Sequence, residues 1–152
     1  MGEILANSTL ICGLCTWLIC QAMKIVINGI KTHQWSFKNW WLSGGMPSSH
    51  SGSAVSVAMS AGLREGFSSA LFAVAFIFAC VVMYDAAGVR RETGKQGKII
   101  NEILRWPEAM FDDSIPDELK EKVGHSPLEV MAGALIGIAC AILFHTVFFP
   151  KG

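Results

Sequence analysis

Residues 67–88 read FSSALFAVAFIFACVVMYDAAG, a run that is apolar on every side until Asp85. Because a transmembrane helix needs about 20 mostly apolar residues, this run is long enough to span a bilayer. Residues 127–149 read PLEVMAGALIGIACAILFHTVFF, and only Glu129 and His145 interrupt their apolar character. The two runs therefore predict two membrane-spanning helices.

Two further segments complete the predicted bundle. Residues 4–30 are apolar apart from one charged side chain, Lys24, and are long enough to span. Residues 48–63 are shorter and hold many small and hydroxyl side chains: Ser48, Ser49, Ser51, Ser53, Ser56, Ser60, Gly52, Ala54, Ala58 and Ala61. Small residues let helix backbones approach closely, so this helix belongs inside a bundle. The predicted fold is an all-α integral membrane bundle of about four transmembrane helices, with residues 1–152 as a single domain.

The composition agrees with a membrane protein. Hydrophobic residues make up 52% of the chain and charged residues 16%, which is more apolar than an ordinary soluble domain. Twelve Lys and Arg balance twelve Asp and Glu, and this formal net charge of zero excludes the basic footprint of a nucleic-acid-binding protein. The five cysteines all lie in apolar runs, where a thiol behaves as a small buried hydrophobe and not as part of a disulfide framework.

A long polar stretch, residues 89–124, separates the third and fourth predicted spans. Within it KIINEILRW, residues 98–106, places apolar side chains at helical spacing before Pro107. This pattern predicts an interfacial helix anchored by Trp106, a lid, or a helix packed on the bundle surface.

Basic residues are divided unevenly between the two sides of the predicted membrane. Ten lie on or near the side of the two larger loops: Lys24, Lys31, Lys38, Arg90, Arg91, Lys95, Lys98, Arg105, Lys120 and Lys122. Only Arg64 and Lys151 lie on the other side. By the positive-inside rule we expect an integral protein of a bacterial cytoplasmic membrane, with the larger loops inside.

The same topology brings four helix ends to one side of the membrane. The second helix opens with GGMPSSHS (residues 44–51), the fourth opens with GHSPLE (124–129), and the third ends with DAAGVRR (85–91). The unusual polar residues of the chain are therefore expected to enclose one polar cavity.

This cavity is suited to an anion. Two facing helix N-termini offer free backbone N–H groups and the positive ends of two helix dipoles. Ser48 or Ser49 is expected to cap the first of them, and both serines are expected to help bind the anion. Lys24, Arg90 and Arg91 add positive charge, and the guanidinium fork matches phosphate oxygens. The implied ligand is a phosphate.

Two histidines at such a site suggest phosphoryl transfer. A neutral imidazole is a good nucleophile, and an imidazolium can protonate a leaving alcohol. Glu129 follows His125 by four residues, on the same helical face, and can hold one ring nitrogen protonated. His50 has no such partner nearby in sequence and is the better candidate for the acid. Asp85 remains open between a catalytic role and an ion pair with one of the neighbouring arginines.

Three blocks of the chain resemble the divergent branch of the type 2 phosphatidic acid phosphatase superfamily: residues 44–51, 85–91 and 124–130. The resemblance implies a phosphohistidine mechanism on a lipid phosphate or diphosphate, without a metal or other cofactor. It makes His125 the nucleophile, His50 the proton donor to the leaving group, and Glu129 the residue that orients the nucleophile.

The chain departs from the superfamily pattern at three places. Ser49 replaces a glycine, Glu118-Leu119 stands where the pattern has Ser-Arg, and a KxxxxxxRP block has no counterpart. A lipid-phosphate binding or transport protein that retains the anion site is therefore the alternative to a phosphatase. A third hypothesis is a metal-dependent enzyme with His50, His125, Asp85 and Glu129 as ligands.

The remaining histidines and the tryptophans have simpler interpretations. His145, on the opposite side of the membrane, is expected to be structural, and His33 to be a loop residue. Trp35, Trp40 and Trp41 are expected to form an aromatic belt at the membrane interface. The expected partners are a lipid phosphate substrate and membrane lipids, with no nucleic acid, and the sequence leaves open whether the protein is a homo-oligomer.

Overall fold

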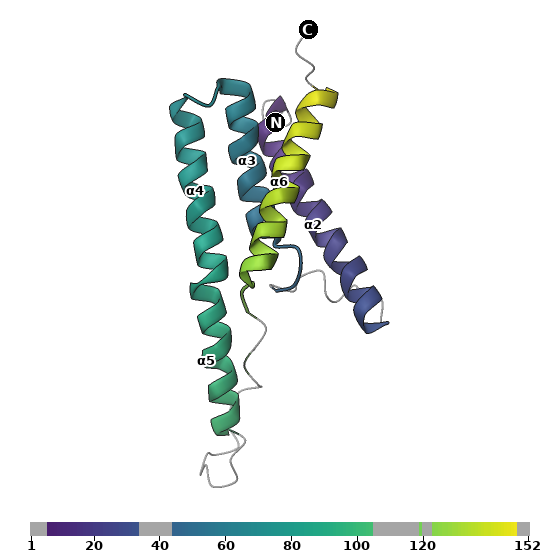
Figure 1. Ribbon diagram of the computed structural model, residues 1–152, viewed down its shortest axis with the longest axis vertical. Helices are drawn as coiled ribbons and strands as arrows, with labels where there is room; N and C mark the ends of the chain where they lie inside the picture. Colours follow the sequence, from purple (N-terminus) through teal and green to yellow (C-terminus); the bar gives the residue numbers. More distant parts are fainter. Residues whose placement is uncertain (1–5, 34–43, 105–118, 120–122, 149–152) are drawn as a thin grey trace.

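A computed structural model of the chain describes residues 6–33, 44–104, 119 and 123–148. Within these residues the chain forms five helices and no strand: α2 (Ser8–Thr32), α3 (Ser49–Glu65), α4 (Ala70–Ala87), α5 (Val89–Leu104) and α6 (Pro127–Phe148) (Figure 1). The predicted all-helical bundle is confirmed. The predicted interfacial tryptophans lie outside the described residues: Trp35, Trp40, Trp41 and Trp106.

Side-chain caps set the starts of three helices. Asn7, Ser48 and Ser69 each accept a hydrogen bond from the backbone N–H three residues further on. Such a cap satisfies a backbone donor that has no partner inside the helix. The helices therefore begin a few residues away from the ends of the apolar runs, at the nearest capping side chain.

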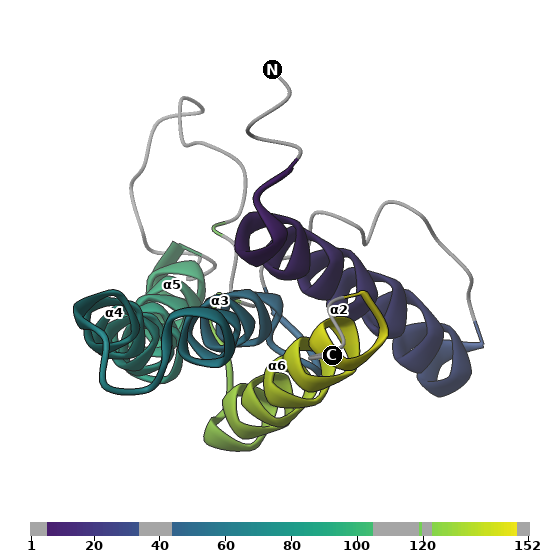
Figure 2. The ribbon, with the colours of Figure 1, turned by 90° about the horizontal axis from the view of Figure 1, so that it is seen from above.

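In the described part of the chain, three helices are long and apolar enough to cross a membrane: α2, the combined α4 and α5 over Ala70–Ile103, and α6. Helix α3 has 17 residues and lies in the middle of the bundle, in contact with α2, α4 and α6 (Figure 2). Its buried positions are all small: Ser49, Ser51, Gly52, Ala54, Ser56, Ala58, Ser60, Ala61 and Gly62. The small buried side chains of the serine-rich helix thus pack against its neighbours, as its composition predicts.

The polar stretch after the third span is more helical than the sequence predicts. Helix α5 begins at Val89, directly after α4, and not at Lys98. It continues the line of α4 beyond the end of the bundle (Figure 1). Because Arg, Lys, Glu and Gln are good helix formers, a polar segment of this kind forms a helix without any apolar periodicity. Hydrophobic periodicity alone therefore misses its first two turns.

Four helix ends meet at one end of the bundle, as the topology predicts. Helices α3 and α6 begin there, α2 ends there, and α4 passes into α5 there (Figure 1). The polar residues predicted to form a site are carried by these ends.

Candidate active site

The N-terminus of α3 is held in place by hydrogen bonds from two other helices. The Ser48 hydroxyl accepts a hydrogen bond from the Ser51 N–H (3.3 Å), which confirms Ser48 as the cap. The Ser48 N–H donates to the carbonyl oxygen of Glu129 in α6 (3.0 Å). From α2, the Lys24 ammonium donates to the Ser49 hydroxyl (3.2 Å). Lys24 is only 7% exposed, so its charge is fixed beside the first turn of α3.

His125 is fixed by backbone contacts just before α6. Its N–H donates to the carbonyl oxygen of Ala86, at the end of α4 (3.0 Å). The preceding residue, Gly124, has φ +85° and packs on the backbone of Arg90 and Arg91, where a Cβ would overlap main-chain atoms. Only glycine combines that conformation with so close an approach. The imidazole therefore has a defined position at the junction of α4, α5 and α6.

Glu129 links the start of α6 to His125. Its Oε2 accepts a hydrogen bond from the Ser126 N–H (2.9 Å), and the Ser126 hydroxyl accepts one from the Glu129 N–H (3.4 Å). This reciprocal pair is a capping box. The same Oε2 lies 3.4 Å from Nδ1 of His125. A helix cap thus also aims a carboxylate at the imidazole.

The protonation of His125 follows from its surroundings. Burial lowers its pKa below the ordinary value of 6.5, the charge of Lys24 lowers it further, and Glu129 opposes both. The ring is therefore neutral near pH 7. With Glu129 facing Nδ1, the proton belongs on Nδ1, and Nε2 carries the free electron pair.

The two predicted histidines lie next to each other. The ring centroids of His50 and His125 are 6.1 Å apart with an angle of 60° between the ring planes. His125 is 2% exposed, and its Nε2 has no hydrogen-bond partner among the described residues. The buried Nδ1 of His50 has none either within that part of the chain. Buried polar atoms normally have partners, so these nitrogens point to a ligand.

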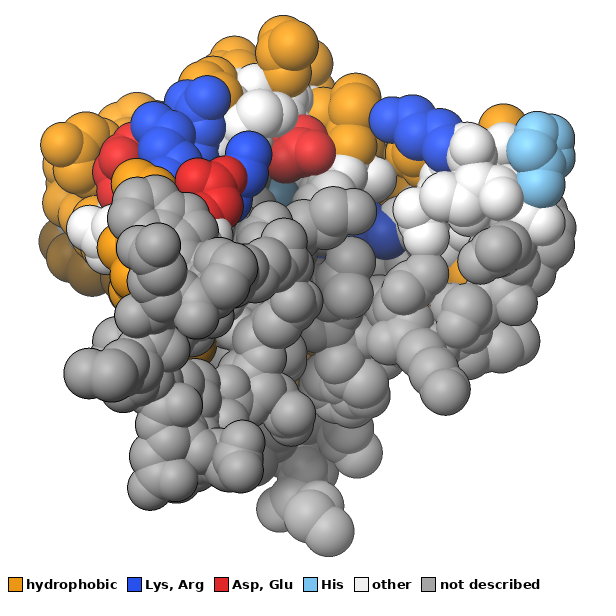
Figure 3. Space-filling model, turned by 90° about the horizontal axis from the view of Figure 1, so that it is seen from below, with side chains coloured by type: hydrophobic (Ala, Val, Ile, Leu, Met, Phe, Trp, Pro, Cys, Tyr) orange, Lys and Arg blue, Asp and Glu red, His pale blue; other side chains and the backbone are white. Residues whose placement is uncertain are grey.

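The predicted cations and acids are arranged in two groups. Lys24 and Glu129 line a polar pocket of about 110 Å³, together with Lys31 and the backbone of Gly44 and Gly45. The second group lies at the end of α4 and along α5, where charged side chains gather on the end of the molecule seen in Figure 3.

Asp85 and Arg90 belong to the second group. The Arg90 guanidinium donates to the Asp85 carboxylate (2.6 Å), and both side chains are about two-fifths exposed. Arg91 is exposed, and no contact between its side chain and either histidine occurs in the described residues. The structure thus gives Asp85 the ion pair that the sequence left open.

Close packing of α3 on α6 sets the spacing between the histidines. A Cβ on Gly133 of α6 would overlap the carbonyl oxygen of Ser48, and one on Gly137 would lie 2.5 Å from the carbonyl oxygen of Gly52. The two helices therefore touch backbone to backbone. Small residues repeated every four positions are the usual means of such contact between membrane helices.

Gly133→Ala is expected to lower the thermal stability of the protein in detergent. The added methyl group must push α3 away from α6, and such overpacking costs about 1–3 kcal/mol. Thermal unfolding of the purified variant measures the loss. Ala139→Leu, at an exposed position of the same helix, is the control and should leave the melting temperature unchanged. An unaltered melting temperature for Gly133→Ala would contradict the packing described above.

The opposite end of the bundle carries a separate hydrogen-bonded group. Ser60 lies 2.8 Å from Nε2 of His145 and donates to the Thr9 hydroxyl (3.1 Å), and Arg64 donates to Ser8. These contacts tie α3 to α2 and α6 far from the two site histidines. They agree with the structural role expected for His145.

Sequence reasoning missed Ser126. The motif Ser126-Pro127-Leu128-Glu129 has the S-x-x-E spacing of a capping box and would have revealed the link between the cap and the carboxylate. Among the described residues, no group of three or more His, Cys, Asp and Glu side chains is placed to hold a metal ion.

Two comparisons with known proteins bear on this site. Residues 5–140 match the family described as "Divergent PAP2 family". The chain is 34% identical over 157 residues to the "Uncharacterized membrane protein YuiD" of Bacillus subtilis (strain 168), and the alignment covers 96% of this chain and 99% of that protein. No solved structure gives a significant match.

Proposed function

Because the chain belongs to the divergent PAP2 family of membrane proteins, we propose that it is a membrane-embedded phosphatase acting on a lipid phosphate or diphosphate through a phosphohistidine intermediate. One observation carries the proposal: buried His125 faces Glu129 through Nδ1, its Nε2 has no hydrogen-bond partner among the described residues, and the ring centroid of His50 lies 6.1 Å from that of His125. A nucleophile, the group that orients it and an acid are thereby present in one place.

In the first step, Nε2 of His125 attacks the phosphorus atom as the bond from phosphorus to the leaving oxygen breaks. His50, protonated, gives its proton to that oxygen. Glu129 stabilises the positive charge that develops on the His125 ring. In the second step water attacks the phosphohistidine, neutral His50 takes a proton from the water, and inorganic phosphate leaves.

The developing negative charge has two stabilising partners. The first turn of α3 presents backbone N–H groups and the positive end of the helix dipole. Lys24, held by Ser49, adds a full positive charge beside that turn. Preorganised charges in a water-poor site usually supply the largest single contribution to such catalysis.

Phosphate release by the detergent-solubilised protein tests the proposal. The substrates are phosphatidic acid, an isoprenyl phosphate and an isoprenyl diphosphate, with and without EDTA. We expect release from at least one of them, and an acid-labile phosphate bound to the protein on rapid quenching. Absence of phosphate release from all three substrates would contradict catalysis. Phosphate release that persists in EDTA would eliminate the metal-dependent hypothesis.

The pH profile should follow His125. Because the neutral ring is the nucleophile and its pKa is lowered, activity is expected to persist as the pH falls to 6.5 and to decline only below it. Removing the charge in Lys24→Gln should let the pKa of His125 rise, moving this acid limb to higher pH. The position of the limb in kcat/KM against pH is the measurement, whatever the maximal rate. An acid limb at the same pH in Lys24→Gln as in the wild type would show that the charge of Lys24 does not affect the pKa of His125.

A non-catalytic lipid-phosphate binding or transport protein is the second candidate, and the Asp85–Arg90 pair favours it. With Arg90 engaged by a carboxylate, Lys24, held by the Ser49 hydroxyl, is left to supply the positive charge beside the first turn of α3. Binding of phosphatidic acid by the wild-type protein without phosphate release or phosphohistidine would support this candidate.

We place the site on the cytoplasmic side of a bacterial cytoplasmic membrane. Described cations at the site end are Lys24, Lys31, Arg90, Arg91, Lys95 and Lys98, whereas Arg64 is at the other end. In a variant without the natural cysteines, Lys95→Cys in inside-out vesicles should react with an impermeant thiol reagent, and in intact cells it should not. Labelling in intact cells would reverse the orientation.

A further inference from the structure

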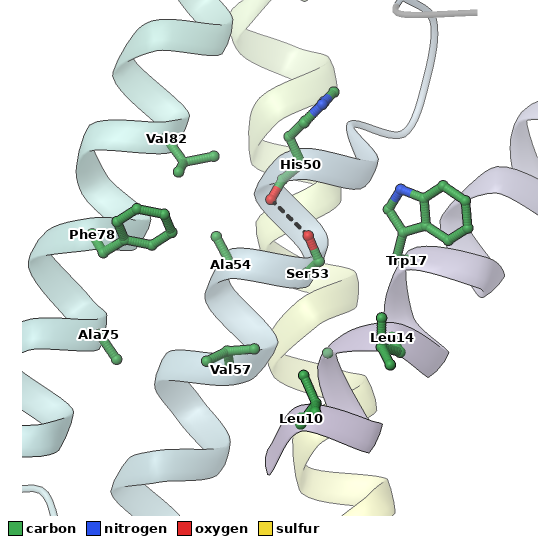
Figure 4. Close-up of a pocket in the computed structure, with 11 residues that line it drawn as sticks. Leu10, Leu14, Trp17, His50, Ser53, Ala54, Val57, Ala75, Phe78 and Val82 are labelled. Atoms are coloured by element: carbon green, nitrogen blue, oxygen red, sulfur yellow. Dashed lines mark hydrogen bonds between the residues drawn. The ribbon is translucent and has the colours of Figure 1, made fainter. Parts of the chain in front are cut away.

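An apolar cavity opens between α2 and α4, with α3 as its floor. Its volume is about 570 Å³, within the range of small-molecule sites. In the described residues α2 contacts α3 and α6 but not α4, so the space between α2 and α4 is bridged only by α3. Leu14 and Trp17 form one wall, and Phe78 and Val82 form the other (Figure 4).

His50 lies at one end of this cavity (Figure 4). Figure 4 shows its imidazole pointing away from the apolar residues, beyond the end of the cavity that His50 helps to line. The polar pocket with Lys24 and Glu129 does not share a single lining residue with that space. His50 lines the apolar cavity only, whereas the polar pocket is lined by Glu129, the residue whose carboxylate lies 3.4 Å from Nδ1 of His125.

Resting on the proposed function, we infer that the α2–α4 cavity holds the apolar chain of the substrate, which enters sideways from the bilayer between α2 and α4. The occupant follows from three features: apolar walls, a position among membrane-spanning helices, and His50 at one end, whose ring centroid lies 6.1 Å from that of His125. A phosphate with an apolar chain complements all three. A neutral lipid chain would leave the buried imidazole nitrogens without partners.

This placement defines which part of the substrate is the leaving group and by which route each product departs. The chain in the cavity belongs to the leaving group, since His50 borders the cavity and gives its proton to the leaving oxygen. The phosphoryl group transferred to His125 remains on the side of Lys24 and Glu129. Water enters and phosphate leaves through the polar pocket, while the dephosphorylated lipid returns to the bilayer between α2 and α4.

Photo-crosslinking tests the cavity without relying on activity. Phosphatidic acid with a diazirine in its acyl chain is incorporated into nanodiscs with the full-length protein, and labelled peptides are mapped by mass spectrometry. We expect labels at cavity positions within residues 10–17 and 75–82, about tenfold above those from phosphatidylcholine with the same chain. Equal labelling by the two probes, or crosslinks between two copies of the chain at this opening, would overturn the inference.

Two filling variants and one control add a kinetic test. Ala75→Phe fills the cavity from α4 and Leu14→Trp fills it from α2, whereas Ala73→Phe makes the first change at an exposed position outside the cavity. Each filling variant should lose about tenfold in labelling and in kcat/KM for long-chain phosphatidic acid, and stay within about twofold for phenyl phosphate. The control should change neither. Filling variants that behave like the control would overturn the inference.

The inference and the proposed function fail in different ways. Cavity labelling by phosphatidic acid in a protein that releases no phosphate would refute the phosphatase and keep the chain site. Phosphate release with labels confined to the outer faces of α4 would refute the chain site and keep the phosphatase.

Discussion

His125→Ala is expected to lower phosphate release from the best lipid substrate by at least about 10³-fold, to the background rate. Without Nε2 no phosphohistidine can form, and the transition state loses its nucleophile. The neighbouring groups cannot replace it, because Glu129 caps α6 through Ser126 and Lys24 donates to Ser49. Release of inorganic phosphate and quench-trapped, acid-labile protein phosphate are both measured, and both should vanish.

The fold of this variant should survive. The hydrogen bond that fixes the segment before α6 runs from the backbone N–H of residue 125 to the Ala86 carbonyl and is kept in any non-proline variant. His125→Asn keeps a polar side chain of similar reach, and it is the control for a loss of activity that is caused by a packing defect. Normal melting temperatures with no activity in both variants support the nucleophile. Substantial activity in either one would contradict the phosphohistidine route.

The sequence predicts the outer helices well because their signal is local. Helices α4 and α6 come from long apolar runs, and a helix satisfies the backbone hydrogen bonds of such a run within the run itself. The central position of α3 also follows from its composition, since serines and glycines at that density are unfavourable against lipid. The start of α5 at Val89 could not be predicted in this way, because residues 90–98 contain no apolar side chain that could repeat at helical spacing.

The site is predictable to the extent that it depends on topology. Placing the starts of α3 and α6 on one side brings His50 near His125, and the four-residue spacing brings Glu129 near His125. Individual contacts between side chains cannot be predicted from topology. The hydrogen bond from Lys24 to Ser49 depends on how α2 packs against α3. The ion pair between Asp85 and Arg90 depends on the rotamers of both side chains.

The close contact between helices is the physical reason for that limit. The distance between the two histidines is decided by Gly133 and Gly137, which allow backbone contact with Ser48 and Gly52, 85 residues earlier in the sequence. The α2–α4 cavity arises in the same way. It exists because α2 and α4 both pack on α3 and, in the described residues, do not contact each other. No local sequence pattern predicts whether two such helices will be in contact.

His50→Ala is expected to lower phosphate release from a lipid phosphate by about 10²–10⁴-fold, the usual contribution of a general acid. The loss should depend on the leaving group. An alkoxide is a poor leaving group and needs the proton of His50, whereas p-nitrophenolate leaves without one. For p-nitrophenyl phosphate the first-turnover release of p-nitrophenol should therefore fall by less than about tenfold. It is compared with the first-turnover release of the alcohol from the lipid phosphate, because the second step, in which His50 takes a proton from water, is common to both substrates.

The comparison separates an acid from a residue that merely packs near the site. His50 lies 6.1 Å from the His125 ring and borders the cavity through which we propose that the lipid leaves, so its removal also disturbs packing. A packing defect would slow both substrates by the same factor, because it would displace His125 whatever the leaving group. Equal losses would therefore remove His50 from the role of acid while leaving His125 as the nucleophile. Unequal losses, larger for the alkyl substrate, are what a proton delivered to the leaving oxygen requires.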